Sequence, residues 1–318
     1  MTSRIHRMFG SMALFAGLAL SFLAVQPAAA ATDINSCPFV IATPGQYRVA
    51  NDLVSTLPGA CITITANDVH LNLVGHTITG PTNCLAPVTP VSTGIQVGAV
   101  ENVHINNGTV GPMFTDGIRL TGTTNSHVNA MLVTGNCVTG FLLTTASNNS
   151  FHAITVELTS NVPILCAGYR LINSHGNVFT SNEVVRNGDF AFINPAFELN
   201  GSNSNTIQSS NLSDNHGGVI LRGNSDSNVV RANTVANNQG HGIVAEITSD
   251  RNLIQANTVT GSLGSGIYLQ LGATFNTVQA NTALGNAVFD GQDDNPACDS
   301  NDWDSNNFGT TNNPSCVQ

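Results

Sequence analysis

The sequence predicts an all-β fold, a right-handed single-stranded parallel β-helix solenoid of about 9–10 coils. Three observations predict it. A glycine followed by an apolar residue recurs at a nearly constant interval. Two columns of asparagine repeat at the same interval. Short β-branched stretches lie between these markers, and none of them has the 3.6-residue periodicity of a helix.

The glycine column defines the length of one coil. Ala196 fills its one gap, and the steps run from 22 residues (196 to 218) to 28 residues (140 to 168). A coil this short cannot bury its apolar side alone, whereas stacked coils bury it continuously at about 4.8 Å per coil. The pairs are Gly94-Ile95, Gly117-Ile118, Gly140-Phe141, Gly168-Tyr169, Gly218-Val219, Gly242-Ile243 and Gly266-Ile267.

The asparagine columns are expected at the corners of the coils. Asparagine tolerates left-handed backbone conformation, and its amide can bond its copy in the next coil. A left-handed β-helix and a β-propeller are the alternatives. No hexapeptide repeat occurs, and the repeat is too short for a propeller blade. The first column holds Asn149, Asn177, Asn205, Asn228, Asn252 and Asn276, and the second Asn182, Asn211, Asn233, Asn257 and Asn281.

Residues 1–31 resemble a signal peptide. Arg4 and Arg7 precede an apolar run from Met12 to Val25, and small residues near Ala30 and Ala31 offer a cleavage site. A membrane anchor is the alternative, but this run is shorter than the ~20 residues that a spanning helix needs. We therefore expect a secreted or periplasmic protein.

Residues 32–318 are expected to form one β-helix domain. Its N-terminal cap and first coil span 32–80, its repeat coils 94–290 and its C-terminal cap 291–318. Cysteines in an exported chain suggest disulfides. The expected pairs are Cys37 with Cys61, Cys298 with Cys316, and Cys137 with Cys166, which leaves Cys84 without an assigned partner.

Both ends of the domain resemble a known family, and this resemblance supports the predicted fold. The family is that of bacterial right-handed parallel β-helix repeat proteins, which belong to the pectin-lyase-like superfamily. The first coils of these proteins resemble segments 47–52, 61–66 and 69–80. Their closing motif resembles the tail that runs from Cys298 through Trp303 and Phe308 to Cys316. The resemblance implies the fold. It leaves the activity open, because the superfamily includes lyases, hydrolases, epimerases and adhesins.

Charge narrows the class of partner. The formal net charge is −10, and the sequence contains no lysine. Nucleic acids and anionic membranes are therefore not expected as partners, because their phosphates require cations. A polysaccharide is the expected ligand, neutral or bridged by cations. No later stretch is apolar enough for membrane insertion, and we expect a monomer.

Two familiar motifs do not combine into a catalytic site. Asp116 before Gly117 and His241 before Gly242 look like parts of a polygalacturonase site. They occupy equivalent positions five coils apart, about 24 Å at the spacing of stacked strands. Paired carboxylates in a glycosidase lie within about 5–10 Å of each other. We therefore interpret both as turn residues.

An outward stripe of polar residues is the better candidate for a ligand-binding face. Arg170 lies one coil before Glu198, and Arg222 one coil before Glu246. Tyr268 and Gln270 continue the stripe. A carboxylate beside an arginine and a tyrosine could abstract the proton next to a uronate carboxylate, with the arginine neutralising the enolate. The alternative is a set of exposed ion pairs, each contributing about 0.2–1 kcal/mol. Tyr268 and Tyr169 are the best-placed aromatic residues for stacking on sugars.

No metal site or other cofactor is expected, with one weaker exception. The acidic tail, which includes Asp290, Asp293 and Asp294, has oxygen ligands of the kind that Ca²⁺ prefers. No EF-hand spacing is present, so a solvated acidic cap is the favoured interpretation.

Three functions remain open. The first is an exported β-helix that binds a polysaccharide on its outer face. The second is a polysaccharide lyase or C5-epimerase acting on uronate polymers. The third is a structural protein of the adhesin type.

Overall fold

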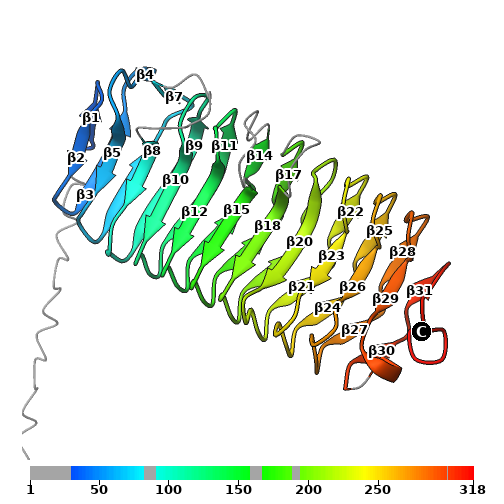
Figure 1. Cartoon of the computed structure of the whole chain (residues 1–318). Helices are drawn as coiled ribbons and strands as arrows, with labels where there is room; N and C mark the ends of the chain where they lie inside the picture. Colours follow the sequence, from blue (N-terminus) through cyan, green and yellow to red (C-terminus); the bar gives the residue numbers. More distant parts are fainter. Residues whose placement is uncertain (1–29, 82–90, 158–166, 188–193, 299) are drawn as a thin grey trace, which may run out of the picture. The chain divides into compact units, whose positions relative to one another are not determined.

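A computed structural model describes residues 30–81, 91–157, 167–187, 194–298 and 300–318. Ala31–Gln318 forms one compact unit, a parallel β-solenoid whose strands stack coil upon coil (Figure 1). The predicted all-β fold of about ten coils is confirmed. The predicted signal peptide lies outside the described residues, apart from 30 and 31. Within the described ranges, no helix has the length and apolar character that crossing a membrane requires.

Within the described residues, three parallel sheets form the sides of the solenoid. The 11-stranded sheet, here sheet 1, carries the candidate site. Its strands are β2 (Phe39–Ile41), β5 (Gly59–Ile64), β8 (Ser92–Val97), β10 (Asp116–Thr121), β12 (Thr139–Thr144), β15 (Ala167–Ile172), β18 (Pro195–Asn200), β20 (Gly217–Arg222), β23 (Ile243–Ala245), β26 (Ile267–Leu269) and β29 (Gly291–Asp293).

The 16-stranded sheet is sheet 2. It contains β1 (Thr32–Ile34), β3 (Gly45–Val49), β4 (Leu53–Val54), β6 (Val69–Asn72), β7 (Thr77–Thr79), β9 (Val103–Val110), β11 (His127–Thr134), β13 (Ser150–His152), β14 (Thr155–Glu157), β16 (Val178–Thr180), β17 (Glu183–Val185), β19 (Thr206–Gln208), β21 (Val229–Arg231), β24 (Leu253–Gln255), β27 (Thr277–Gln279) and β30 (Asp302–Asp304).

Sheet 3, the four-stranded sheet, closes the third side of the later coils. It contains β22 (Thr234–Ala236), β25 (Thr258–Thr260), β28 (Thr282–Leu284) and β31 (Asn307–Phe308). A short 3₁₀ helix, Pro296–Cys298, lies in the C-terminal cap.

The glycine column marks a corner where the coils approach each other closely. The apolar residues that follow these glycines pair in register from Ile95 to Ile267, as the repeat predicted. A Cβ atom on Gly242 would lie 2.5 Å from the carbonyl oxygen of Gly266 and would also collide with Val259. Glycine is therefore required here because any side chain would push successive coils apart.

The asparagine columns are hydrogen-bonded ladders inside the solenoid. The Oδ1 atom of Asn252 accepts bonds from the backbone N–H (2.9 Å) and the Nδ2 (3.1 Å) of Asn228. Asn252 in turn donates both bonds to Asn276, so the predicted coil-to-coil bonding is confirmed. In the second column, Ser210 occupies the position that the sequence assigned to Asn211.

The expected conformation of these asparagines was wrong. The left-handed residue is the one before each ladder position, for example Ser227, Arg251 and Phe275. The ladder asparagines themselves are buried and direct their amides along the stack. The side-chain bonds to the next coil hold the turn, so the left-handed position accepts residues other than asparagine or glycine.

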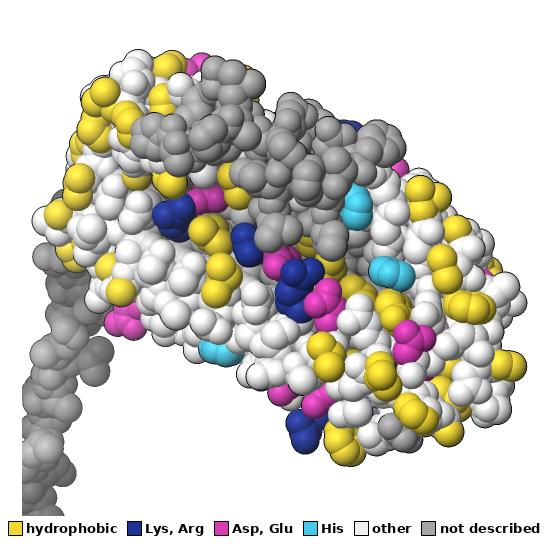
Figure 2. Space-filling model, in the orientation of Figure 1, with side chains coloured by type: hydrophobic (Ala, Val, Ile, Leu, Met, Phe, Trp, Pro, Cys, Tyr) yellow, Lys and Arg dark blue, Asp and Glu magenta, His cyan; other side chains and the backbone are white. Residues whose placement is uncertain are grey.

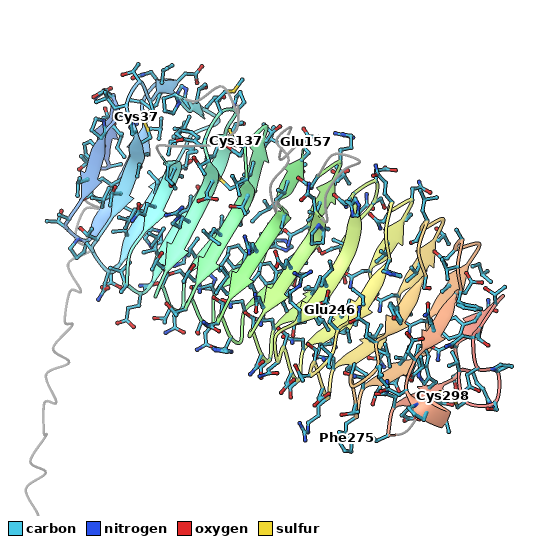
Figure 3. The ribbon with its side chains drawn as sticks, viewed as in Figure 1. Cys37, Cys137, Glu157, Glu246, Phe275 and Cys298 are labelled. Atoms are coloured by element: carbon cyan, nitrogen blue, oxygen red, sulfur yellow. A yellow bond between two sulfur atoms is a disulfide. The ribbon has the colours of Figure 1, made fainter. Side chains whose placement is uncertain are left out.

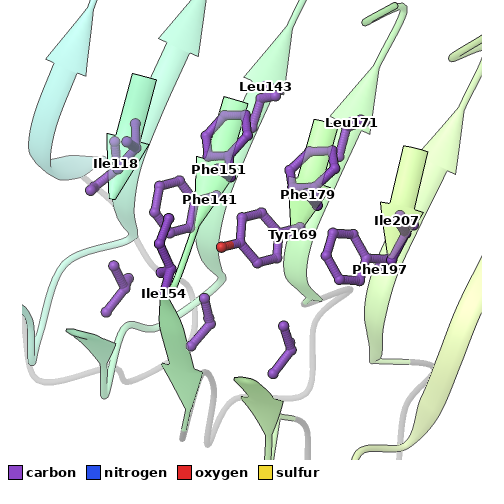
Figure 4. Close-up of a cluster of buried hydrophobic side chains, with 14 of the residues drawn as sticks. Ile118, Phe141, Leu143, Phe151, Ile154, Tyr169, Leu171, Phe179, Phe197 and Ile207 are labelled. Atoms are coloured by element: carbon purple, nitrogen blue, oxygen red, sulfur yellow. The ribbon is translucent and has the colours of Figure 1, made fainter. Parts of the chain in front are cut away.

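A double stack of aromatic rings fills the middle of the core. Phe141, Tyr169 and Phe197 stack at centroid distances of 4.7 and 4.6 Å, and Phe151 stacks on Phe179 at 4.7 Å (Figure 4). Tyr169 is fully buried, so its predicted role in stacking on sugars was wrong. It follows a column glycine, and the residue at that position points inward.

Disulfides and a tryptophan secure the ends. Cys37 pairs with Cys61 and Cys298 with Cys316, as predicted. Cys137 is disulfide-bonded as well, whereas Cys84 and Cys166 lie outside the described residues. Such disulfides suggest an extracellular or periplasmic protein. Trp303 pairs with Val278 of the preceding coil and covers the C-terminal end of the core.

The asparagine ladder predicts a graded loss of stability. Asn257→Ala leaves the backbone N–H and the Nδ2 of Asn233 without their acceptor, and should lower the free energy of unfolding by about 2–4 kcal/mol. Asn257→Ser should cost about half as much, because a serine hydroxyl accepts the equivalent bond at Ser210. Denaturant unfolding measures both. Equal losses would contradict the role assigned to the ladder.

Tyr169 predicts a stabilising substitution. Its hydroxyl is buried and has no hydrogen-bond partner among the described residues, and burial raises the pKa of this phenol well above its ordinary value. Tyr169→Phe should therefore raise the free energy of unfolding by about 1 kcal/mol. Phe141→Tyr, which adds a hydroxyl to the same stack, should lower it. A loss of stability in Tyr169→Phe would reveal a partner for this hydroxyl.

Candidate functional site

The predicted stripe exists as two rows on the outer face of sheet 1. Coil-to-coil pairing places Arg170 beside Glu198, followed by Ile220, Val244 and Tyr268 in one row. The second row holds Arg222, which pairs with Asn200, and continues through Glu246 and Gln270, which follow β23 and β26 directly. All six predicted residues therefore lie on one face.

A continuous line of charges joins four of them. Arg170 Nε lies 3.2 Å from Glu198 Oε2, and Arg222 Nη2 lies 3.3 Å from Glu246 Oε1. Arg222 Nη1 also lies 3.5 Å from Glu198 Oε1, a contact between the two rows that the sequence had not indicated. In Figure 2, basic and acidic side chains lie next to each other over the middle of this face.

These ion pairs are more buried than expected. The sequence allowed an interpretation as exposed cross-strand pairs, but Glu198 is only 4% exposed and the two arginine side chains about a quarter. Burial changes their energetic role, because a buried charge that loses its partner is strongly destabilising. The line therefore acts as a fixed electrostatic support.

Next to this line the surface forms a hollow of about 200 Å³. It opens where Gly217 takes the position held by Asp116, Thr139 and Pro195 in earlier coils. The loss of that side chain makes room. The residues that line the hollow are His216, Gly217, Ile220, Gly240, His241, Val244, Glu246 and Gln270.

The hollow has an apolar floor and polar walls. Ile220 and Val244 form the floor and are almost fully buried. Glu246, which is labelled in Figure 3, adds a carboxylate to the lining, and His216 and His241 add imidazoles. Such a combination of an apolar base with a few polar groups is typical of small-molecule sites.

His241 is held in one orientation by the next coil. Its Nδ1 accepts a hydrogen bond of 2.9 Å from the backbone N–H of Ser265, and its ring lies 4.9 Å from that of Tyr268. In the neutral form the proton is therefore on Nε2, which makes this nitrogen a hydrogen-bond donor. Burial lowers the pKa of His241, and the charge of Asp294 opposes this effect.

Tyr268 is fixed from the C-terminal side. Its hydroxyl donates a bond of 2.6 Å to Asp294, which also accepts one from Gln292. Burial, together with this bond to a carboxylate, raises the pKa of Tyr268 to about 12. Tyr268 therefore remains a protonated phenol at neutral pH.

The sequence analysis did not assign three residues to this candidate site, namely His216, His241 and Asp294. His241 was compared with Asp116, and the structure confirms that they occupy the same row five coils apart. Asp116 itself is buried, paired with Arg119 and bonded by Thr139, which fits a turn residue. Comparison of His241 with Tyr268, one coil later, would have revealed the contact. His216 carried no signal of its own, and Asp294 had been considered only as a possible ligand of Ca²⁺.

The aspartates of the tail have protein partners. Asp290 accepts bonds from the backbone N–H groups of Gly309 and Thr310. Asp293 accepts a bond of 2.8 Å from Trp303 Nε1. Within the described ranges, no three histidine, cysteine or acidic side chains are grouped to hold a metal ion. Binding of Ca²⁺ near these aspartates stays a prediction.

Comparison with known proteins confirms the class of fold. Residues 167–313 match the family described as "Right handed beta helix region", so the chain contains a right-handed parallel β-helix. No curated protein matches the sequence.

Solved structures share the fold at low identity. The A-module of mannuronan C-5 epimerase AlgE6 from Azotobacter vinelandii is 14% identical with a TM-score of 0.57, and 86% of each chain is covered. A mutant DFA-IIIase from Arthrobacter chlorophenolicus A6, in complex with DFA-III, is 14% identical with a TM-score of 0.55 over 78% of this chain. The Dettilon tailspike protein is 13% identical with a TM-score of 0.58 over 84% of it. The chain spans 63% of the DFA-IIIase and 55% of the tailspike.

His241 predicts a pH dependence of stability. Its pKa in the folded protein is lowered, so the unfolded chain takes up the proton first as the pH falls below about 6.5. The stabilisation is complete above that pH and is lost as the pH falls through the folded pKa. His241→Gln keeps an acceptor for Ser265 without a titrating group. Between about pH 7.5 and pH 5.5, its melting temperature should fall less than that of the wild type. If the melting temperatures of the wild type and of His241→Gln fell equally with pH, His241 would not be the source of this pH dependence.

Proposed function

We propose that this chain binds a polysaccharide on the outer face of sheet 1, with one sugar unit seated in the hollow between His216, His241 and Glu246. The apolar floor with its polar walls is the observation that carries the proposal. A sugar ring has an apolar C–H face and a rim of hydroxyl groups. Ile220 and Val244 would contact the apolar C–H face. The two imidazoles, Glu246 and Gln270 would form hydrogen bonds with the hydroxyl groups.

The proteins of similar fold support this class of ligand. They include an epimerase named for mannuronan and an enzyme crystallised with DFA-III. Because identity is at most 14% in these comparisons, their substrates serve as a guide only to the chemical class.

Export and a monomeric state belong to the same proposal. A signal peptide cleaved near Ala30 and Ala31 would deliver the chain to the periplasm or the medium. The disulfides Cys37–Cys61 and Cys298–Cys316 are consistent with this destination.

Catalysis on uronate polymers, by a lyase or a C5-epimerase, is the second candidate. His216 favours it, because its side chain has no hydrogen bond among the described residues and burial lowers its pKa. A neutral imidazole of this kind can accept a proton from a bound sugar. Turnover of a uronate polymer that His216→Gln abolishes would establish this reaction. A purely structural role of the adhesin type predicts neither turnover nor binding in the hollow.

Filling the hollow tests the proposal directly. A Cβ on Gly217 would lie at least 3.6 Å from its neighbours, so a side chain there projects into the hollow without disturbing the stack. Gly217→Leu should weaken binding of oligosaccharides found on a glycan array at least about tenfold, with little change in melting temperature. Gly217→Ala is the matched control and should retain most of the affinity. Unchanged binding by Gly217→Leu would exclude the hollow as the site.

A further inference from the structure

The arginines beside the hollow already have carboxylate partners. Glu198 lies between Arg170 (3.2 Å) and Arg222 (3.5 Å), and Arg222 extends its other nitrogen to Glu246 (3.3 Å). Two positive and two negative charges therefore cancel along this line. A guanidinium bound on both sides has little left to offer the carboxylate of a ligand.

The other groups around the hollow add no positive charge at neutral pH. Burial lowers the pKa values of His216 and His241, which keeps both imidazoles neutral. Asp294, behind Tyr268, adds a negative charge near His241. The sequence contains no lysine that could supply a cation from elsewhere.

Glu246 stands between the ligand and the nearest cation. Glu246 lines the hollow, and its Oε1 forms an ion pair with the Nη2 of Arg222. A carboxylate accepts hydrogen bonds strongly but donates none, so it suits the hydroxyl groups of a sugar. The same carboxylate repels an anionic sugar, because like charges placed together without a counter-ion are unfavourable.

We infer that the hollow selects neutral sugars over uronates, and that Glu246 is the residue that determines this specificity. The inference rests on the proposed function, which it narrows from polysaccharides in general to neutral ones. It also separates the two candidate functions. Any reaction in this hollow would act on a neutral sugar, whereas a uronate lyase or epimerase needs a free cation for the carboxylate.

The specificity depends on one charge that can be removed without changing shape. Glu246→Gln keeps an oxygen for sugar hydroxyls and frees one side of Arg222. The Glu246 side chain is 29% exposed, so the substitution does not bury an unpaired group. Glu157→Gln is the matched control. Glu157 also pairs with an arginine, Arg186, but it lies on β14 of sheet 2, well apart from Glu246 (Figure 3).

The experiment compares two classes of ligand on three proteins. Glucan, fructan and mannan hexasaccharides, and hexamers of galacturonate and mannuronate, are titrated calorimetrically at neutral pH into wild type, Glu246→Gln and Glu157→Gln. We expect the wild type to bind at least one neutral hexamer at least about tenfold more tightly than either uronate. Glu246→Gln should reduce this ratio at least about fivefold, and Glu157→Gln should leave it unchanged.

Three results would overturn the inference, and they differ from failure of the proposed function. Uronates bound by the wild type as tightly as neutral hexamers would show that Glu246 does not select. If Glu246→Gln and Glu157→Gln changed the ratio of the two affinities equally, the preference for neutral sugars would come from the net charge of the protein. An unchanged ratio in Glu246→Gln alone would place the selectivity elsewhere. If no carbohydrate binds, or if binding ignores Gly217→Leu, the proposed site itself fails.

Discussion

Hydrogen bonding from each coil to the next is the constraint on which the rest of this structure depends. Parallel backbone pairing sets the spacing of the coils, and the buried asparagines repeat that spacing with their side chains. An amide both donates and accepts, so a row of asparagines can continue from coil to coil, whereas an ionised carboxylate only accepts. The glycine column allows the close approach, and the aromatic stacks fill the space enclosed.

The same constraint explains how far the sequence could predict the structure. A repeat of 22–28 residues identifies which residues lie one coil apart, so the glycine column, the ladders and the pairs Arg170–Glu198 and Arg222–Glu246 could be derived. The inward direction of Tyr169 could have been derived as well, because neighbouring residues of a strand point to opposite faces and Arg170 was placed outward. The conformation of the ladder asparagines could not, because it depends on where the backbone bends within a coil, and residue spacing does not contain that information.

The candidate site was predicted less completely, and for a physical reason. The contact between Glu198 and Arg222 crosses from one row to the other, so a comparison of equivalent positions misses it. The hollow arises from a missing side chain at Gly217, which no search for functional groups can detect. Asp294 lies one coil after Gln270, but Asp290 replaces the column glycine in this coil, so the repeat does not mark its register.

The last coil covers the end of the core, and the bond from Tyr268 to Asp294 also makes it part of the candidate site. Growth of the solenoid by duplication is therefore directional. A coil inserted before β15 would leave the hollow, the ion pairs beside it and the bond from Tyr268 to Asp294 intact. A coil inserted after β26 would separate Tyr268 from Asp294 and break that bond. Longer relatives of this chain should accordingly differ in the number of their N-terminal coils, while the interval between the hollow and the cap stays constant.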